Sequence, residues 1–177
     1  MTHRPMAWIA VLSVAATALA QTEHDPAQHH SPYAGQEPSG IAALSARELS
    51  DLREGAGMGL ARAAELNHYP GPRHVLELAA ELALTDEQRA GIESIHSGML
   101  ERAKSLGAQI IEKESELDRR FAHRHLDDET LHRILLELGR LEAELRFVHL
   151  SAHLTTTALL TEEQIRSYDR ARGYEGR

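Results

Sequence analysis

The chain has 177 residues and a formal net charge of -8, because 27 aspartates and glutamates outnumber 19 lysines and arginines. An acidic balance argues against general nucleic-acid binding, which needs a basic face, and fits a soluble protein or one that meets cations or basic partners. The chain contains no cysteine, which excludes a disulfide framework and thiolate chemistry. Its length predicts one domain with an appendage.

The N-terminus supplies that appendage, because it has the pattern of a secretory signal peptide. Arg4 precedes an uncharged run that continues to Thr22, and Ala18-Leu19-Ala20 fits a small-residue cleavage site. We predict that residues 1–20 are removed, so that the mature chain begins near Gln21 outside the cytoplasm and has no membrane span. The alternative is a retained anchor, since an uncharged run of about 18 residues nearly spans a bilayer.

Residues 21–40 contain several prolines and glycines and no hydrophobic period, so we predict a flexible leader. This leader holds His24, His29 and His30. A histidine-rich tract can bind metal, but the composition favours a solvated linker. Residues 41–177 are predicted to form a single helical domain.

Short helices are predicted in the first part of this domain. Ser45-Ala46-Arg47-Glu48 is a capping box that opens the first one, and glycines around Met58 end it. Two more are expected over Leu60–Leu66 and His74–Leu82, on either side of the rigid turn Tyr69-Pro70-Gly71-Pro72. Helices of this length are unstable alone, so we expect them to fold back on a longer element.

Two near-copies of one phrase frame the rest of the chain. Leu84-Thr85-Asp86-Glu87-Gln88 and Leu160-Thr161-Glu162-Glu163-Gln164 are both capping boxes, with threonine as N-cap and glutamine at the third helical position. Acidic residues in the first turn suit the positive end of the helix dipole. The first phrase therefore opens a long helix from Asp86 to about His123, and the second opens a short C-terminal helix.

Apolar residues recur at helical spacing along two consecutive arms, which meet at the turn Leu126-Asp127-Asp128. The first arm carries Ile92, Ile95, Met99, Ala103, Leu106, Ile110, Leu117 and Phe121. The return arm, from about Glu129 to Leu159, carries Leu131, Ile134, Leu138, Leu141, Leu145, Val148, Ala152, Thr155 and Leu159. A narrow seam on both arms predicts an all-α fold, a long antiparallel helical hairpin with the short N-terminal helices folded back and a short C-terminal helix.

The return arm also has a second apolar stripe of Phe147, Leu150 and Leu154, about 200° around the helix from the seam at 100° per residue. A helix that is apolar on two sides is expected to be covered on both. Either the short N-terminal helices or a second subunit would cover this stripe, so we predict a homodimer and name these three residues as partner-binding candidates.

The two Leu-Thr-x-x-Gln phrases at the ends of a helical hairpin, behind an export signal, resemble the LTxxQ-motif family. That family holds the periplasmic Spy/CpxP-type stress proteins and related heavy-metal-resistance sensors. The resemblance implies an antiparallel, cradle-shaped dimer in the periplasm. It also implies an ATP-independent chaperone or adaptor for non-native proteins or an envelope-stress sensor, or alternatively a heavy-metal-binding sensor.

His149 and His153 are the strongest candidates for chemistry. They stand four residues apart on the return arm, which places two imidazoles on one face, able to share a divalent Zn, Cu, Ni or Co ion. By helical position they are expected beside the core rather than inside it. The alternative is a pair of packing or surface residues. A third ligand must come from another segment, and the candidates are His68, His74, Glu77 and Met58. The resemblance supports metal, because sensors of the family use such pairs with a glutamate and a methionine.

A further histidine cluster surrounds the hairpin turn, where metal binding and a solvated, pH-sensitive tip are both open. It consists of His123, His125, Glu129 and His132.

Enzymatic signatures are missing: there is no His-Glu-x-x-His, no Gly-x-Ser-x-Gly and no phosphate-binding loop of the Gly-x-x-x-x-Gly-Lys type. The sequence therefore predicts a non-enzymatic protein with no certain cofactor.

Overall fold

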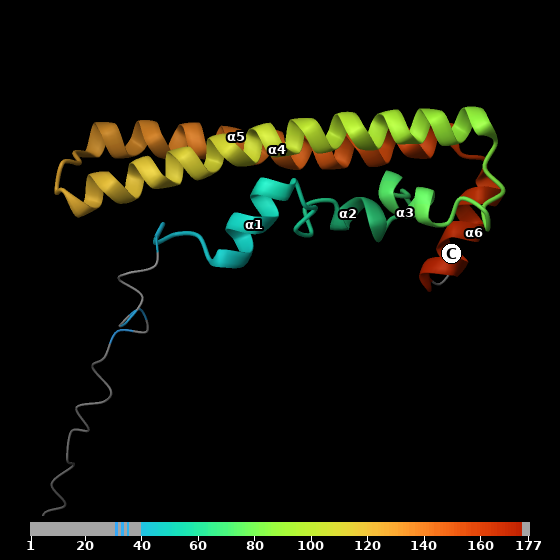
Figure 1. Cartoon of the computed structure of the whole chain (residues 1–177), viewed down its shortest axis with the longest axis horizontal. Coiled ribbons are helices and arrows are strands. Elements are labelled where there is room, and N and C mark those ends of the chain that lie inside the picture. Colours follow the sequence, from blue (N-terminus) through green and yellow to red (C-terminus); the bar gives the residue numbers. More distant parts are fainter. Residues whose placement is uncertain (1–30, 32, 34, 36–39, 175–177) are drawn as a thin grey trace, which may run out of the picture. The chain divides into compact units, whose positions relative to one another are not determined.

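A computed structural model describes residues 31, 33, 35 and 40–174 of the chain. These residues form six helices and, within the described part, no strand (Figure 1). The chain divides into Met1–Glu37 and Pro38–Arg177, and all six helices belong to the second unit. The predicted signal peptide and the leader histidines lie outside the described residues. Among the helices that are described, none is both long enough and apolar enough to cross a bilayer.

The predicted hairpin is confirmed. Helices α4 (Asp86–Ala122) and α5 (Asp128–Leu159) run antiparallel along one another, and their bounds lie within one residue of those predicted (Figure 1). Asp127 is the N-cap of α5, and its carboxylate accepts a hydrogen bond of 2.8 Å from the backbone N–H of Thr130. This cap satisfies one of the otherwise unpaired N–H groups at the start of the return helix.

The predicted seam forms the main core between α4 and α5. Its buried members are Ala103, Leu106, Ile110, Ile134, Leu138, Leu141, Leu145 and Val148. The prediction is wrong at three positions near the ends of the arms: Phe121 is 58% exposed, Leu159 is 39% exposed, and Thr155 is exposed while Thr156 is fully buried. A repeat that alternates steps of three and four drifts about 20° per heptad relative to a straight α-helix, so the buried face leaves the pattern at its ends.

Charged side chains connect the two arms on the solvent side. Lys113 Nζ lies 3.2 Å from a Glu116 carboxylate oxygen and 2.7 Å from one of Glu137, so it bridges α4 and α5. By contrast, Glu114 on α4 lies near another carboxylate, Glu142 on α5. Partial burial and the like charge of Glu142 raise the pKa of Glu114.

The glutamines of the two Leu-Thr-x-x-Gln phrases join the start of α4 to α6 (Glu162–Arg172). Each glutamine caps its own helix, and the amide of each donates to the side-chain oxygen of the other at 2.9 Å. The Gln88 amide also donates to the Leu159 carbonyl at 2.7 Å, and the Gln164 amide to the Leu82 carbonyl at 3.2 Å. The paired phrases are therefore a clasp that closes the open end of the hairpin.

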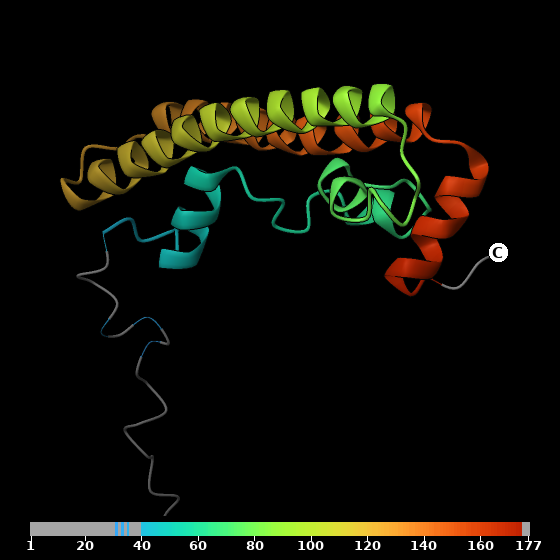
Figure 2. The same cartoon turned by 45° about the vertical axis from the view of Figure 1, so that its right-hand side comes forward.

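The short helices α1 (Ala46–Glu54), α2 (Arg62–Glu65) and α3 (Pro72–Glu77) fold back along the hairpin as predicted (Figures 1 and 2). Helix α1 approaches α4 closely at Gly107, where a Cβ would stand 2.1 Å from the Leu52 carbonyl oxygen. Two bounds are corrected, because α2 is shorter than expected and α3 starts at Pro72 and ends at Glu77. The chain turns after α3 and buries Leu82, whose carbonyl the clasp then uses.

Candidate functional site

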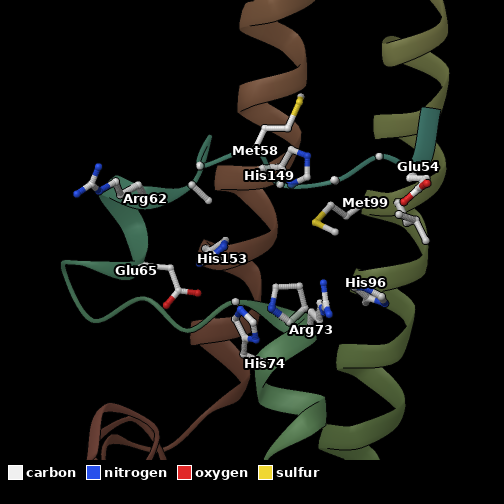
Figure 3. A pocket seen from close by; sticks show the side chains of 18 of the residues that line it. Glu54, Met58, Arg62, Glu65, Arg73, His74, His96, Met99, His149 and His153 are labelled. Carbon is white, nitrogen blue, oxygen red and sulfur yellow. The ribbon is translucent and has the colours of Figure 1, made fainter. Parts of the chain in front are cut away.

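A cavity of about 730 Å³ lies between the hairpin and the folded-back N-terminal segments (Figure 3). Helix α5 contributes His149 and His153 to its lining, and α4 contributes His96 and Met99. The remaining lining comes from the end of α1, the glycine-rich segment after it, α2, the start of α3, Leu100 of α4, and Tyr174, which follows the C-terminal helix. Residues more than 80 positions apart in the chain, such as Tyr69 and His153, are in contact here.

His153 is 7% exposed and is held in a defined orientation. Its Nδ1 lies 2.8 Å from the backbone carbonyl oxygen of Tyr69. Since a carbonyl can only accept, Nδ1 carries the hydrogen and the neutral ring keeps its free lone pair on Nε2. The ring edge lies against Gly71, where a Cβ would be 2.7 Å from Cε1 and 3.0 Å from Nε2. An imidazole whose other nitrogen donates to a carbonyl is the usual arrangement of a metal-binding histidine.

His149 lies one helical turn earlier and is 3% exposed. Its Nε2 is buried and has no hydrogen-bond partner among the described residues. Burial, and secondarily the neighbouring His153, lower the pKa of His149, so its ring stays neutral near pH 7. A buried polar atom without a partner costs about 1–3 kcal/mol, which a bound ligand would offset.

The expectation that this pair lies beside the core is therefore wrong. Helical position places His149 and His153 to one side of the seam, but α2 and α3 lie on that side and cover both rings. The N-terminal segments thus bury the histidines, and they leave the second apolar stripe of α5 uncovered.

The structure brings some of the predicted third ligands to the cavity and not others. His74 and Met58 line it. His74 Nδ1 is 2.8 Å from a carboxylate oxygen of Glu77, which is itself exposed and does not line the cavity. His68 lies elsewhere, with its Nδ1 2.8 Å from a carboxylate oxygen of Asp169 in α6.

Sequence reasoning missed three residues of this cavity. Met99 was assigned to the seam, yet Figure 3 shows its side chain extending from α4 toward α5 among the cavity residues. His96 precedes it by three residues on the same helix, a spacing that could have marked a second polar face. Glu65 of α2 also lines the cavity. Its carboxylate already accepts hydrogen bonds from the hydroxyls of Tyr168 and Tyr174, each at 3.0 Å.

Oxygen, nitrogen and thiolate ligands alone do not complete a metal site here. In the part of the chain that the structure describes, no three or more histidine, cysteine, aspartate or glutamate side chains are grouped to hold an ion. This also applies to the cluster at the hairpin turn, where His123, His125, Glu129 and His132 are all exposed. The rings of His123 and His125 are 6.3 Å apart and face solvent, as the solvated-tip alternative predicts.

Exposed apolar side chains follow the face of α5 that points away from the seam. Phe147 is 60% exposed and Leu154 is 57% exposed, whereas Leu150 is half-buried. Leu136, which is 65% exposed, lies on the same face about three helical turns before Phe147. We call this face the outer stripe; its exposed members are Leu136, Ala143, Phe147, Leu154 and Ala158.

Comparison with known proteins agrees with the paired phrases. The sequence profile described as LTXXQ motif family protein matches residues 72–172, which include both phrases and the whole hairpin. No curated protein and no solved structure matches the chain significantly. Because the match covers more than half of the chain and contains the glutamine clasp, this protein belongs to the LTXXQ motif family.

Proposed function

We propose that this protein is a periplasmic stress-response protein of Spy/CpxP type, which binds non-native proteins without ATP and catalyses no reaction. LTXXQ proteins are in general periplasmic and non-enzymatic. The observation that carries the proposal is the outer stripe of α5, an apolar surface that the rest of the described chain leaves exposed. Apolar patches of this kind, bordered by polar residues, mark protein-binding surfaces.

The stripe suits an extended, partly unfolded segment. From Leu136 to Leu154 it runs about 27 Å along the helix, at 1.5 Å per residue. Exposed charged residues border it, among them Arg140 and Arg146. Non-native chains expose apolar side chains that such a surface can cover, and the positive border attracts acidic segments. A homodimer that forms through another face of the protein would place two such stripes in one particle.

The test measures suppression of aggregation of an unfolding client by light scattering, with no ATP present. Equimolar parent protein should suppress aggregation, and the double variant Phe147→Ser, Leu154→Ser should lose most of that effect. The matched control is Phe121→Ser, which removes an equally exposed aromatic residue outside the outer stripe. A parent protein that fails to suppress aggregation at several-fold excess would refute the proposal. Sedimentation of both variants shows whether the stripe instead holds a second copy of the chain.

A second candidate function is a heavy-metal-binding sensor or resistance protein centred on His149 and His153. The specific observation in its favour is that His153 keeps a lone pair on Nε2 while the buried Nε2 of His149 lacks a partner among the described residues. A metal that binds only the folded protein should raise the melting temperature with metal concentration. The double change His149→Ala, His153→Ala should abolish this dependence. Because both rings are buried, the variant also melts lower without metal, so the informative quantity is the metal-dependent shift.

A further inference from the structure

We propose that the cavity binds a soft monovalent ion, Cu(I) or Ag(I), through His149, His153 and the thioether of Met99, with Met58 as a fourth donor. This inference rests on the second candidate function and specifies its metal. It differs from the expectation of a divalent ion held by histidines and a carboxylate. Three features carry it: the orientation of the imidazoles, the placement of the two methionines, and the engagement of the nearby carboxylate.

The two imidazoles supply nitrogen donors from one face of α5. Residues four apart on a helix have Cβ atoms about 5–6 Å apart, which lets both rings reach one ion. His153 keeps its free lone pair on Nε2 because Nδ1 donates to Tyr69, and the Nε2 of His149 lacks a partner among the described residues. Neither ring has to break a hydrogen bond at Nε2 in order to bind.

Met99 supplies a sulfur donor from α4. It is half-buried on α4, and its side chain crosses toward α5 within the cavity (Figure 3). Packing alone does not require a thioether at this position, because leucine fills a similar volume. A thioether is a soft ligand, and soft ligands select Cu(I) over hard divalent ions.

Met58 has an unusual backbone conformation. Its φ is +44°, in the left-handed region that non-glycine residues rarely adopt, and glycines stand on both sides of it. Glycine or asparagine would form this turn at lower cost, since left-handed backbone costs other residues about 1–2 kcal/mol. The turn carries the methionine over the cavity, where its side chain lies above His149 in Figure 3. A methionine at this position places a thioether at the cavity, where its sulfur can serve as a ligand.

The carboxylates of the cavity are poorly placed for a hard ion. The Tyr168 hydroxyl lies within hydrogen-bond distance of both oxygens of Glu65, and the Tyr174 hydroxyl donates to one of them. Glu54, the other carboxylate in the lining, is exposed at the end of α1. Arg62 and Arg73 also line the cavity, and their positive charge disfavours a divalent ion more than a monovalent one. His74 and His96 also line the cavity, but no three histidine or carboxylate side chains of the described residues are grouped to hold one ion, so sulfur donors are needed to complete the site of His149 and His153.

The test is X-ray absorption spectroscopy of the full chain loaded with Cu(I) under anaerobic conditions. The chain carries His24→Gln, His29→Gln and His30→Gln, which removes the leader histidines as competing ligands. The sequence contains no cysteine and four methionines, so a sulfur neighbour of copper must be a methionine. We expect a sulfur contribution that decreases in Met99→Leu and is lost in Met58→Leu, Met99→Leu.

Competition with a chromophoric Cu(I) chelator measures the affinity of the same proteins. Met99→Leu should weaken Cu(I) binding on the order of tenfold or more, as for loss of a metal-site residue, and leave Zn(II) and Ni(II) binding unchanged. The matched control is His123→Gln, which removes an exposed donor at the hairpin turn that does not line the cavity, and it should have no effect. Equal melting temperatures of the metal-free proteins show that Met99→Leu keeps the fold.

The outcomes separate the inference from the function on which it rests. Copper without a sulfur neighbour, together with Zn(II) or Ni(II) binding that depends on His149 and His153, overturns the Cu(I) inference and leaves the metal function standing. Failure of every tested ion to bind overturns both.

Discussion

Replacing Gly71 with alanine tests the orientation of His153. Gly71 is the N-cap of α3, and its φ of -84° is open to any residue, so backbone strain plays no part. The added Cβ would stand 2.7 Å from His153 Cε1 and 3.1 Å from a carboxylate oxygen of Glu65. Contacts that short force the ring to move, and the ring cannot move without loosening the 2.8 Å hydrogen bond from Nδ1 to Tyr69.

The cost follows from these contacts. Overpacking of a buried site costs about 1–3 kcal/mol, and a domain of this size loses about 4 °C of melting temperature per kcal/mol. We therefore expect metal-free Gly71→Ala to melt roughly 4–12 °C below the parent. A metal at 100 times its dissociation constant stabilises the parent by about 2.7 kcal/mol, or about 10 °C. Gly71→Ala should lose most of that shift, because the displaced ring no longer directs Nε2 at the ion.

The matched control is Gly57→Ala, which lines the same cavity but whose Cβ would meet nothing within 4 Å. It should keep both the metal-free melting temperature and the metal-dependent shift. Differential scanning fluorimetry across a metal titration measures all three proteins. If Gly71→Ala melts like the parent and responds fully to metal, His153 does not face the ion beside Gly71, and the geometry inferred for the cavity is wrong.

Three further predictions concern the scaffold. Gly107→Ala should lower the free energy of unfolding in urea by about 1–3 kcal/mol and speed hydrogen exchange in α1, because the added Cβ would clash with the Leu52 carbonyl of that helix. The control Gly98→Ala, where the Cβ meets open space, should raise the free energy of unfolding by up to about 1 kcal/mol. Equal effects of the two changes would contradict the close approach of α1 to Gly107. Each of the changes Gln88→Ala and Gln164→Ala should lower the free energy of unfolding by about 1–3 kcal/mol. A double-mutant cycle should show a coupling energy of about 0.5–3 kcal/mol between them, and strictly additive effects would argue against the clasp. The pKa of Glu114 is raised above 4.5 in the folded state. The protonated carboxyl therefore stabilises the folded state relative to the unfolded state at low pH, and this stabilisation is lost as the pH rises through the raised pKa. The urea midpoint of unfolding of Glu114→Gln should therefore be higher than that of the parent at pH 7 and equal to it below about pH 4. A variant no more stable than the parent at pH 7 would show that the charged form of Glu114 does not destabilise the folded state.

Local signals in the sequence determined the helical architecture. The capping boxes at Ser45, Thr85 and Thr161 all form, because a cap depends only on residues within one helical turn. The hairpin and its core also followed from the sequence, since apolar spacing on each arm is a property of that arm alone. The family followed from the repeated phrase, which the profile match confirms.

Contacts between distant segments were decided only by the tertiary structure. The sequence placed His149 and His153 beside the core, but α2 and α3 bury the pair. It also grouped them with His68, which instead contacts Asp169 of α6. The sequence also did not predict the reciprocal hydrogen bonds of the two glutamines, because the capping box of its own helix already accounts for each glutamine. Helical periodicity tells which side of a helix a residue occupies. It does not tell which element covers that side. The covering element depends on the geometry of turns such as the one at Met58, which local sequence patterns do not predict.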